Sequence, residues 1–397
     1  MITELRLQNW KSFADAKVFI DPLTIVIGTN ASGKSNIFDA LKFLRALSTP
    51  RYVTEVLNEL RGGVSGAIRR GETFCKLSIV VSDEVEDGTE WCYEVGLSYD
   101  EKQNVYISAE KLSEQGTDTA ESVVLFERVA LAEPLSSEVL VSYYAPEHHY
   151  KWFFQSGASV LSQLAYIDCH ERIKKAASSV AVHLKRIRLA NPIPEHMRGY
   201  STLSDVLWED ASNLAGYLAN MDEESQQLVY SELLKYLAPL PDKDIKDISA
   251  VKIPLTNDAM LVCAEEWIPG ERQEQSARGM SDGTLRFAGI IAMLVTAEDK
   301  SLILLEELDK GVHPSRAKAM VKMLREIGRE KQLDIVCTTH NATFVDELGA
   351  QMIPFISYVK RSEENGCTEV CLLDEKDNLT HLMATRSVGA MMTHNEL

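Results

Sequence analysis

The chain has 397 residues, of which 45% are apolar and 25% charged, so it can form a core large enough for one large domain or two. Its net charge of -18 excludes a protein whose whole surface is basic, and any contact with nucleic acid has to be local. There is no apolar run of about 18 residues and no charged-then-apolar leader, so we expect a cytoplasmic protein without membrane contact. The seven cysteines form no Cys-x-x-Cys pair, which predicts neither a disulfide framework nor a zinc site.

Two short strands, Thr3–Leu7 and Lys17–Ile20, are predicted first, and the apolar run Leu23–Ile27 follows them as a buried strand. Residues 28–35 then read Gly-Thr-Asn-Ala-Ser-Gly-Lys-Ser, which fits the phosphate-loop pattern G-x-x-x-x-G-K-[ST]. The pattern of Asn36–Leu44 predicts an amphipathic helix directly after the loop. The motif therefore has the strand, loop and helix that phosphate binding requires, whereas the alternative is a plain glycine-rich turn.

This loop predicts a site for ATP and Mg2+. Glycines let the main chain approach the phosphates, while successive N–H groups and the positive end of the helix face the β-phosphate. Lys34 reaches the β- and γ-phosphate oxygens, and the hydroxyl of Ser35 is a ligand for Mg2+. The residues that we assign to the nucleotide here are Gly28, Asn30, Ala31, Ser32, Gly33, Lys34, Ser35 and Asn36.

The middle of the chain has two different patterns. Short β-rich runs, such as Cys75–Val81 and Trp91–Leu97, are separated by turn-forming residues and predict an antiparallel sheet. Residues 151–237 have mainly helical patterns, as in Ser204–Leu218 and Glu224–Leu237, but no sustained heptads. We therefore expect a compact helical insertion and no coiled-coil arm.

One dense group of basic residues lies in this predicted insertion, opposed nearby only by Glu171 and Glu195. A solvated helix face is one interpretation, and a local contact with nucleic acid is the other. The basic residues are Arg172, Lys174, Lys175, Lys185, Arg186, Arg188 and Arg198.

After a strand predicted at Asp247–Leu261, apolar strands alternate with helices up to about residue 360, the pattern of a parallel sheet covered by helices. The two ends of the chain are therefore expected to build one nucleotide-binding unit. We divide the chain into an N-terminal ATPase lobe, the helical insertion and a C-terminal ATPase lobe, at residues 1–150, 151–245 and 246–397.

The apolar run Leu302–Leu305 predicts a buried strand that ends in two acids. Because neighbouring side chains on a strand face opposite ways, we assign Glu306 to the Mg2+ shell and Glu307 to the water that attacks the γ-phosphate. The alternative is a strand followed by a charged turn.

Two further segments narrow the class of site. His340 follows an apolar strand, at the strand end where ligands of open parallel sheets gather, and this position suits a contact with the γ-phosphate. Ser281 and Gly283 precede an apolar helix and offer a hydroxyl and a close main-chain approach to phosphate. A purely structural histidine is the alternative for His340.

Four segments, taken together in their order along the chain, resemble the ATPase heads of the ABC superfamily, in the branch of RecF-like and SMC-like proteins and their OLD-like relatives. The resemblance implies an α/β fold, namely an ABC-type ATPase head with a P-loop parallel core sheet, an antiparallel β subdomain and a helical insertion. The opening Ile2–Phe13 is similar to the family's usual start, and Glu306–Pro314 resembles a segment of bacterial ATPases that include anti-phage subunits. The four segments are 28–35, 281–286, 306–314 and 338–340.

The resemblance also implies residue roles. Ser281 and Gly283 match the signature loop, which in the family contacts ATP bound to the opposite subunit, and Asp309 would occupy the turn at that interface. A homodimer or higher homo-oligomer is therefore expected. The implied catalytic residues are Lys34, Glu307 and His340, and the implied Mg2+ residues are Ser35 and Glu306.

The chain departs from the family at two points. The signature reads Met-Ser-Asp-Gly-Thr in place of Leu-Ser-Gly-Gly-Gln, and Leu308 stands where a proline is common. Gln155 is the candidate for the glutamine that couples Mg2+ to conformational change.

Three functions stay open from the sequence. The first is an ATP-hydrolysing switch subunit that controls a separate effector or nuclease in anti-phage defence. The segment after His340 is too short for the nuclease domain of OLD-type proteins, and Asp374–Asp377 is a weak imitation of its acidic motif. The second is a RecF-like ATPase that binds DNA through the basic residues. The third is a scaffold in which ATP joins subunits without hydrolysis.

Overall fold

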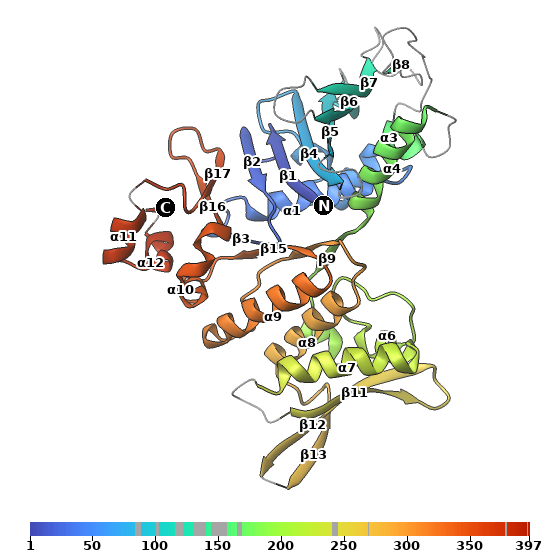
Figure 1. Ribbon diagram of the computed structural model, residues 1–397, viewed down its shortest axis with the longest axis vertical. Helices are drawn as coiled ribbons and strands as arrows, with labels where there is room; N and C mark the ends of the chain where they lie inside the picture. Colours follow the sequence, from blue (N-terminus) through green and yellow to red (C-terminus); the bar gives the residue numbers. More distant parts are fainter. Residues whose placement is uncertain are drawn as a thin grey trace.

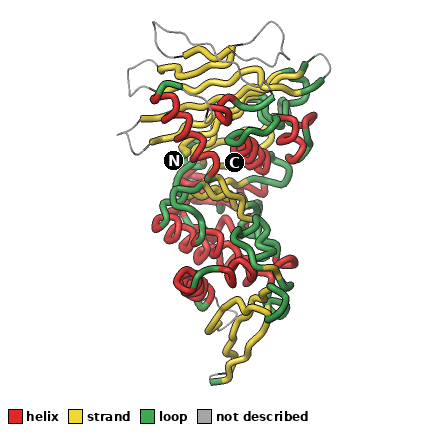
Figure 2. Tube along the Cα trace, turned by 90° about the vertical axis from the view of Figure 1, so that its right-hand side faces the viewer, coloured by secondary structure: helices red, strands yellow, loops and turns green. Residues whose placement is uncertain are grey.

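The architecture is described from a computed structural model of the chain. The residues that it describes are 1–83, 89–100, 103–115, 122–129, 140–143, 157–164, 169–239, 245–268, 270–377, 379–394 and 396–397. They form an elongated molecule with an antiparallel sheet at one end, a mainly parallel sheet in the middle and a further lobe at the other end (Figure 1, Figure 2). Within these ranges, no helix has the length and apolarity needed to cross a membrane.

The central sheet has six strands in the order β17-β16-β3-β15-β14-β9. Neighbouring strands run parallel except β17, which lies antiparallel to β16 at the edge. Leu23, Ile25 and Ile27 of β3 face one core of the molecule, whereas Val26 faces the other. The strands read as unbroken apolar runs because both faces of this sheet are covered. Their bounds are β3 (Leu23–Ile27), β9 (Ile187–Ala190), β14 (Leu302–Leu305), β15 (Asp334–Thr339), β16 (Ile356–Arg361) and β17 (Thr368–Leu372).

Seven strands between residues 2 and 143 form an antiparallel sheet, in the order β2-β1-β4-β5-β6-β7-β8. The predicted runs Cys75–Val81 and Trp91–Leu97 lie in β4 and β5, and the predicted antiparallel subdomain is confirmed. The strands are β1 (Ile2–Gln8), β2 (Asp15–Phe19), β4 (Phe74–Asp83), β5 (Thr89–Tyr99), β6 (Val105–Gln115), β7 (Val123–Val129) and β8 (Leu140–Tyr143).

Helices fill the space between the two sheets and cover the far face of the parallel one. The core between the sheets takes Phe38, Leu41 and Leu44 from the helix that follows the phosphate loop. The helices on this side are α1 (Lys34–Ala46), α2 (Val53–Glu59), α3 (Val160–Leu164) and α4 (Glu171–Lys185). Those on the other side and at the C-terminal end are α8 (Asp282–Val295), α9 (Ala317–Glu330), α10 (Ala342–Leu348), α11 (Leu379–Thr385) and α12 (Val388–Thr393).

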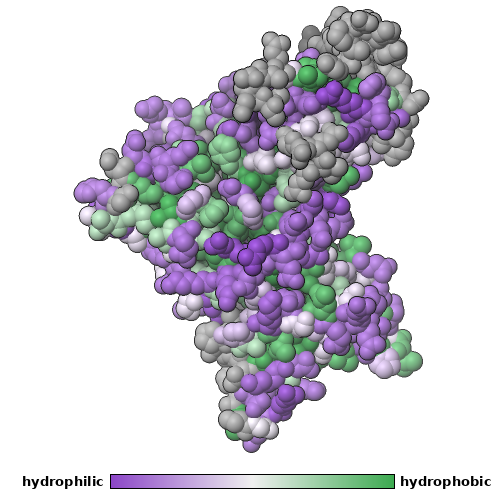
Figure 3. All heavy atoms as spheres, in the orientation of Figure 1, coloured by the Kyte–Doolittle hydropathy of each residue, from purple (hydrophilic) through white to green (hydrophobic). Residues whose placement is uncertain are grey.

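Residues 191–280 form what we call the distal lobe, at the bottom of Figure 1. Its helices pack on a small antiparallel sheet, in which β12 pairs with β10, β11 and β13. On the face shown in Figure 3, hydrophilic side chains cover most of the described surface, as the high net charge leads one to expect. The elements are α5 (Pro194–Met197), β10 (Ser201–Thr202), α6 (Leu214–Asn220), α7 (Glu223–Leu237), β11 (Ile245–Ile253), β12 (Asp258–Ile268) and β13 (Glu271–Ser276).

The middle of the chain differs from the sequence-based expectation in three ways. The predicted insertion contains β9, which pairs with β14 in the core sheet, so it is not purely helical. The helix predicted at Ser204–Leu218 begins only at Leu214, since Ser204 and Asn213 bond the main chain of the preceding loop. The strand predicted at Asp247–Leu261 is a hairpin, because Pro254 ends one strand and a turn precedes the next. The division at residues 150 and 245 stays a prediction.

Candidate active site

The phosphate loop leaves β3 at Ile27 and enters α1 at Lys34. Gly28 and Gly33 have φ of 155° and 114°, and Ala31 has φ of 61°. A Cβ atom on Gly28 would lie 2.3 Å from the carbonyl oxygen of Val359, and one on Gly33 would lie 2.6 Å from Oγ1 of Thr368. Both glycines are therefore required by the close packing of the loop on β16 and β17.

Lys34 is turned into the loop itself. Its Nζ donates hydrogen bonds to the carbonyl oxygens of Gly28 at 2.7 Å and Thr29 at 2.8 Å. Burial lowers the pKa of Lys34, and the charges of Glu307 and Asp309 oppose that shift. These two carboxylates therefore act on the lysine that is predicted to bind phosphate.

The loop offers unsatisfied polar groups that suit a phosphate ligand. Oγ of Ser32 is buried and has no hydrogen-bond partner, which is a cost that folded proteins rarely leave uncompensated. The main chain around Ser32 and Gly33 leads into the positive end of α1. The residues present thus fit an ATP phosphate group.

Asn36 lies beside the loop, in the first turn of α1. Its Nδ2 donates to Oγ of Ser12 at 2.8 Å, and Thr368 donates to the same oxygen at 2.7 Å. Oγ1 of Thr368 also lies 2.8 Å from the carbonyl oxygen of Ser32. The segment Ser12–Phe13, noted in the sequence for its resemblance, thus braces the phosphate loop, and a contact of Asn36 with ATP stays a prediction.

Glu306 lies at the end of β14 and is buried. One guanidinium nitrogen of Arg61, Nη2, lies 2.7 Å and 2.8 Å from its two carboxylate oxygens, and Ser35 bonds the same carboxylate. Burial raises the pKa of Glu306, but the bonds from Arg61 and Ser35 outweigh it, and the pKa lies below its ordinary value. The two residues assigned to Mg2+, Ser35 and Glu306, are in direct contact, and an ionised carboxylate beside a hydroxyl is a donor set that fits this metal.

Glu307 follows the end of β14 and is exposed, whereas Glu306 before it is buried. Its φ of 51° is left-handed, which is unfavourable for a residue with a side chain. The main-chain N–H donates to Oγ1 of Thr338 at 3.0 Å, and Leu308 donates its own N–H to the carbonyl of Thr338 at 2.8 Å. The end of β15 therefore holds Glu307 in this conformation.

His340 follows β15 directly and is exposed at the carboxyl end of the parallel sheet. Asp309 is buried on the neighbouring turn, where Oγ1 of Thr339 donates to its Oδ1 at 2.6 Å. The predicted turn and the predicted switch histidine are thus brought to the same edge of the sheet as Glu307. Their roles toward ATP stay predictions.

The signature segment begins α8. Ser281 is exposed and caps the helix, since its Oγ accepts the N–H of Thr284 at 3.2 Å. Gly283 is buried against the turn after β14, where an added Cβ would lie 2.6 Å from the carbonyl oxygen of Gly311. Gly283 therefore packs against the turn at Gly311 of the same chain, whereas Ser281 is exposed to solvent.

Two arginines, Arg286 and Arg198, bond the main chain around the two acids and the start of α8. Arg286 of α8 is buried and donates to the carbonyl oxygens of Pro192, Glu306 and Glu307 at 2.7, 2.8 and 3.0 Å. Burial lowers the pKa of its guanidinium, against the opposing charges of Glu307 and Asp309. Its place directly before the apolar run Phe287–Val295 of α8 was the available sequence signal.

Arg198 was grouped with the basic residues as a candidate nucleic-acid contact. Its Nη1 donates to the carbonyl oxygens of Ala277, Arg278 and Met280 at 3.1, 3.0 and 2.7 Å, and its Nη2 bonds Asp282. Arg198 therefore binds the signature loop of its own chain, and its grouping with the other cations was wrong.

Three of the remaining basic residues form ion pairs within the chain. Arg172 pairs with Glu114, and Arg186 and Arg188 both pair with Glu298, at 3.4 and 3.5 Å. Two other sequence candidates add nothing to the site. Gln155 lies outside the described residues, and Asp374–Asp377 is a turn in which no described group of His, Cys, Asp or Glu could hold a metal ion.

Comparison with known protein families identifies the family of the chain. The family model AAA_21, described as AAA domain, putative AbiEii toxin, Type IV TA system, matches residues 23–150 and 177–346. No curated protein sequence matches the chain.

Solved SMC heads share the fold. An Smc head bound to the C-winged helix domain of ScpA matches with a TM-score of 0.54 and 13% identity, over 93% of this chain and 97% of that chain. An Smc head domain with an extended coiled coil, bound to the C-terminal domain of ScpA from Pyrococcus furiosus, matches with a TM-score of 0.52 and 10% identity, over 97% and 99%. Since the family model spans most of the chain, the protein belongs to the AAA_21 family of ATPases and has the fold of an ABC-type ATPase head.

Proposed function

We propose that this protein is an ATP-hydrolysing subunit whose two copies close around Mg2+ and ATP and open again after hydrolysis. The observation that carries the proposal is the meeting of the phosphate loop, Glu306, Glu307 and His340 at one edge of the parallel sheet. The signature residue Ser281 faces solvent and has no described packing on its own phosphate loop. Such a head needs a second copy to complete its site.

Each residue has a defined task in this proposal. Lys34 and the N–H groups at the start of α1 bind the phosphates, and Glu307 orients the attacking water and accepts its proton. When bound, Mg2+ supplies the positive charge that stabilises the leaving phosphate oxygens. Ser35 and Glu306 would hold it, and His340 is placed to bond the γ-phosphate.

A mixing experiment tests whether the site is shared between two copies. Lys34→Ala should lose turnover because its phosphate loop is damaged, and Ser281→Arg should lose it because the signature surface is blocked. Mixed in equal amounts, they should regain about a quarter of wild-type turnover, since half of the dimers are mixed and each of these has one intact site. Phosphate release measures the turnover, and thermal melting of each variant checks its fold.

The result distinguishes a site shared between two copies from a site formed within one chain. If Ser281 served the site of its own chain, neither variant could supply what the other lacks, and the mixture would stay inactive. That result would remove the shared site from the proposal.

We further propose that the open and closed states control a separate effector in bacterial anti-phage defence. The support is the family description, which names a putative toxin of a toxin–antitoxin system, a class that works with a second protein. The test is the binding of the protein encoded beside this chain to Glu307→Gln with ATP and to Lys34→Ala. Equal binding to both forms, or none, would remove effector control.

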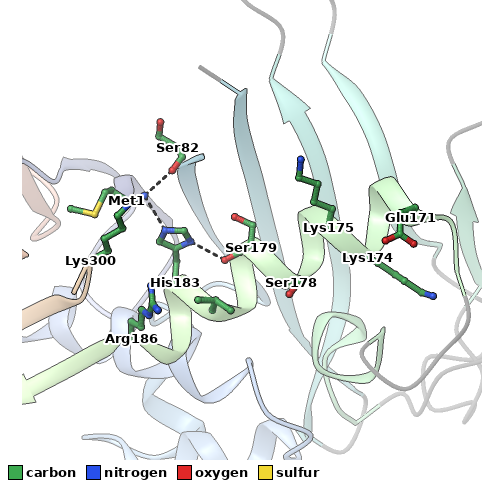
Figure 4. A pocket seen from close by; sticks show the side chains of 11 residues that line it. Met1, Ser82, Glu171, Lys174, Lys175, Ser178, Ser179, His183, Arg186 and Lys300 are labelled. Atoms are coloured by element: carbon green, nitrogen blue, oxygen red, sulfur yellow. Dashed lines mark hydrogen bonds between the residues drawn. The ribbon is translucent and has the colours of Figure 1, made fainter. Parts of the chain in front are cut away.

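A DNA-binding ATPase is the second candidate, and one pocket favours it. Four cations from two parts of the chain line a pocket of about 630 Å3 on α4 (Figure 4). On a chain with a net charge of -18, such a local concentration suits a phosphate backbone. The cations are Lys174, Lys175, Arg186 and Lys300.

Neutralising this pocket tests the second candidate. Changing Lys174, Lys175 and Lys300 together to Gln should weaken DNA binding and reduce the slope of log affinity against log salt by about 2 to 3, because each phosphate contact releases counterions. The matched control changes three lysines of α9 and its C-terminal cap, Lys318, Lys322 and Lys331, to Gln. Fluorescence anisotropy with a labelled duplex measures both. Equal losses in the two triple variants, or none, would remove a DNA contact from this pocket.

A further inference from the structure

Arg61 is a basic residue in contact with the candidate metal site that none of the roles above uses. It follows α2 in the sequence, outside the motifs that identify the site. Its Nη2 lies within 2.8 Å of both oxygens of Glu306, so a single nitrogen bonds both oxygens of the carboxylate. The Arg61 side chain is 55% exposed, whereas that of Glu306 is 12% exposed.

The main-chain carbonyl of Arg61 accepts a hydrogen bond from a buried ion pair. Nζ of Lys11 donates to the carbonyl oxygen of Arg61 at 2.6 Å and to Oδ2 of Asp39 at 2.7 Å. The side chains of Lys11 and Asp39 are only 7% and 2% exposed, so this ion pair is a fixed part of the core beside α1. A continuous set of contacts therefore links the helix after the phosphate loop, through Lys11 and Arg61, to Glu306.

The residues after Arg61 allow its side chain a separate movement. Gly62 and Gly63 have φ of 84° and 58°, and an added Cβ on either would meet no atom closer than 3.4 Å. The carbonyl of Arg61 is thus held by Lys11, whereas the two glycines that follow it form a turn with open space around them. The side chain of Arg61 can leave Glu306 without disturbing packed side chains, because more than half of its surface already faces solvent.

We propose that Arg61 is a displaceable counter-cation, which neutralises Glu306 in the empty site and has to leave this carboxylate when Mg2+ arrives. The inference rests on the proposed function, which assigns Glu306 to the metal. A magnesium ion and its bound waters need accessible lone pairs on the carboxylate, and Arg61 occupies a lone pair on each of its two oxygens. Two positive charges on one carboxylate also repel each other, so Arg61 and the metal compete.

Mn2+ is the probe for the test, since the unbound ion is quantified by its paramagnetic resonance signal. The full chain is titrated with Mn2+ in the presence of a non-hydrolysable ATP analogue. Arg61→Gln should bind Mn2+ about fivefold more tightly than the wild type, the factor that corresponds to loss of one partly exposed ion pair. Arg51→Gln is the matched control, because Arg51 has a similar exposed pair with Glu59 and the same charge is removed.

Three results would overturn the inference. Unchanged or weaker Mn2+ binding in Arg61→Gln would mean that Arg61 orients Glu306 for the metal instead of competing with it. A similar gain in Arg51→Gln would reduce the effect to net charge. A loss of analogue affinity in EDTA for Arg61→Gln would make the arginine a phosphate ligand.

The same titration separates this inference from the proposed function. If the wild type shows no Mn2+ binding that depends on the analogue, the assignment of Glu306 to the metal fails and the inference fails with it. If the wild type binds Mn2+ and Arg61→Gln binds it no better, the inference alone fails.

Discussion

Glu307→Gln should lower ATP turnover by about 100-fold or more while ATP binding persists, because glutamine keeps the shape of the side chain but accepts no proton from water. The closed dimer should then accumulate with ATP, since opening depends on hydrolysis. Phosphate release measures the first effect, and light scattering behind size exclusion, with and without ATP, measures the second.

The geometry of Glu307 motivates this prediction. Its exposed carboxylate stands on a left-handed main chain that the hydroxyl of Thr338 and the guanidinium of Arg286 both hold. Strain that is held from two sides is typical of functional positions. Glu330→Gln, an exposed acid at the end of α9, is the control with the same chemical change.

The result also decides between a switch and a scaffold. A scaffold that ATP joins without hydrolysis has no use for Glu307, so turnover and dimerisation would then be the same in Glu307→Gln and the wild type. That outcome would remove Glu307 from the proposed reaction.

Arg286→Met should destabilise the protein by about 3 to 5 kcal/mol, because the buried carbonyl groups that Arg286 bonds lose their charged donor. Those carbonyls belong to Pro192, Glu306 and Glu307, so the change also frees the main chain that carries both acids. Turnover should fall even where the variant is fully folded. The shift of the urea unfolding midpoint measures the stability, and phosphate release below that midpoint measures the turnover.

The control for this prediction is Arg329→Met, which makes the same chemical change at an exposed position in the last turn of α9. It should leave both quantities close to those of the wild type. Equal behaviour of the two variants would show that the buried bonds of Arg286 contribute little to either stability or activity.

The motifs of the site were recognisable because each depends on a short stretch of chain. The phosphate loop needs its glycines, lysine and serine within eight positions, and the strand before it and the helix after it are visible as local patterns. The same holds for Leu302–Glu307, where an apolar run predicts the strand that leads directly into the two acids. Local geometry fixes these features, so they follow from the sequence.

The segment from β9 to α6 was predicted less well because its conformation depends on interactions that no local pattern shows. β9 has only four residues, and its place in the core sheet comes from pairing with β14, more than one hundred residues later in the chain. The loop before α6 resembles a helix in its apolar spacing, but side-chain bonds from Ser204 and Asn213 to the main chain hold it in another conformation. No local pattern carries this information.

By itself, the sequence determined the phosphate loop, the strand that leads into two acids and the alternating pattern of the nucleotide-binding sheet, since each is encoded within one or two turns or strands. Only the tertiary structure determined which groups the arginines bind. In sequence Arg61, Arg198 and Arg286 are three charges among many, yet they bind Glu306, the signature loop and the main chain of both acids. The partners of a long cationic side chain depend on the fold, because its hydrogen-bond acceptors come from segments far apart in the chain.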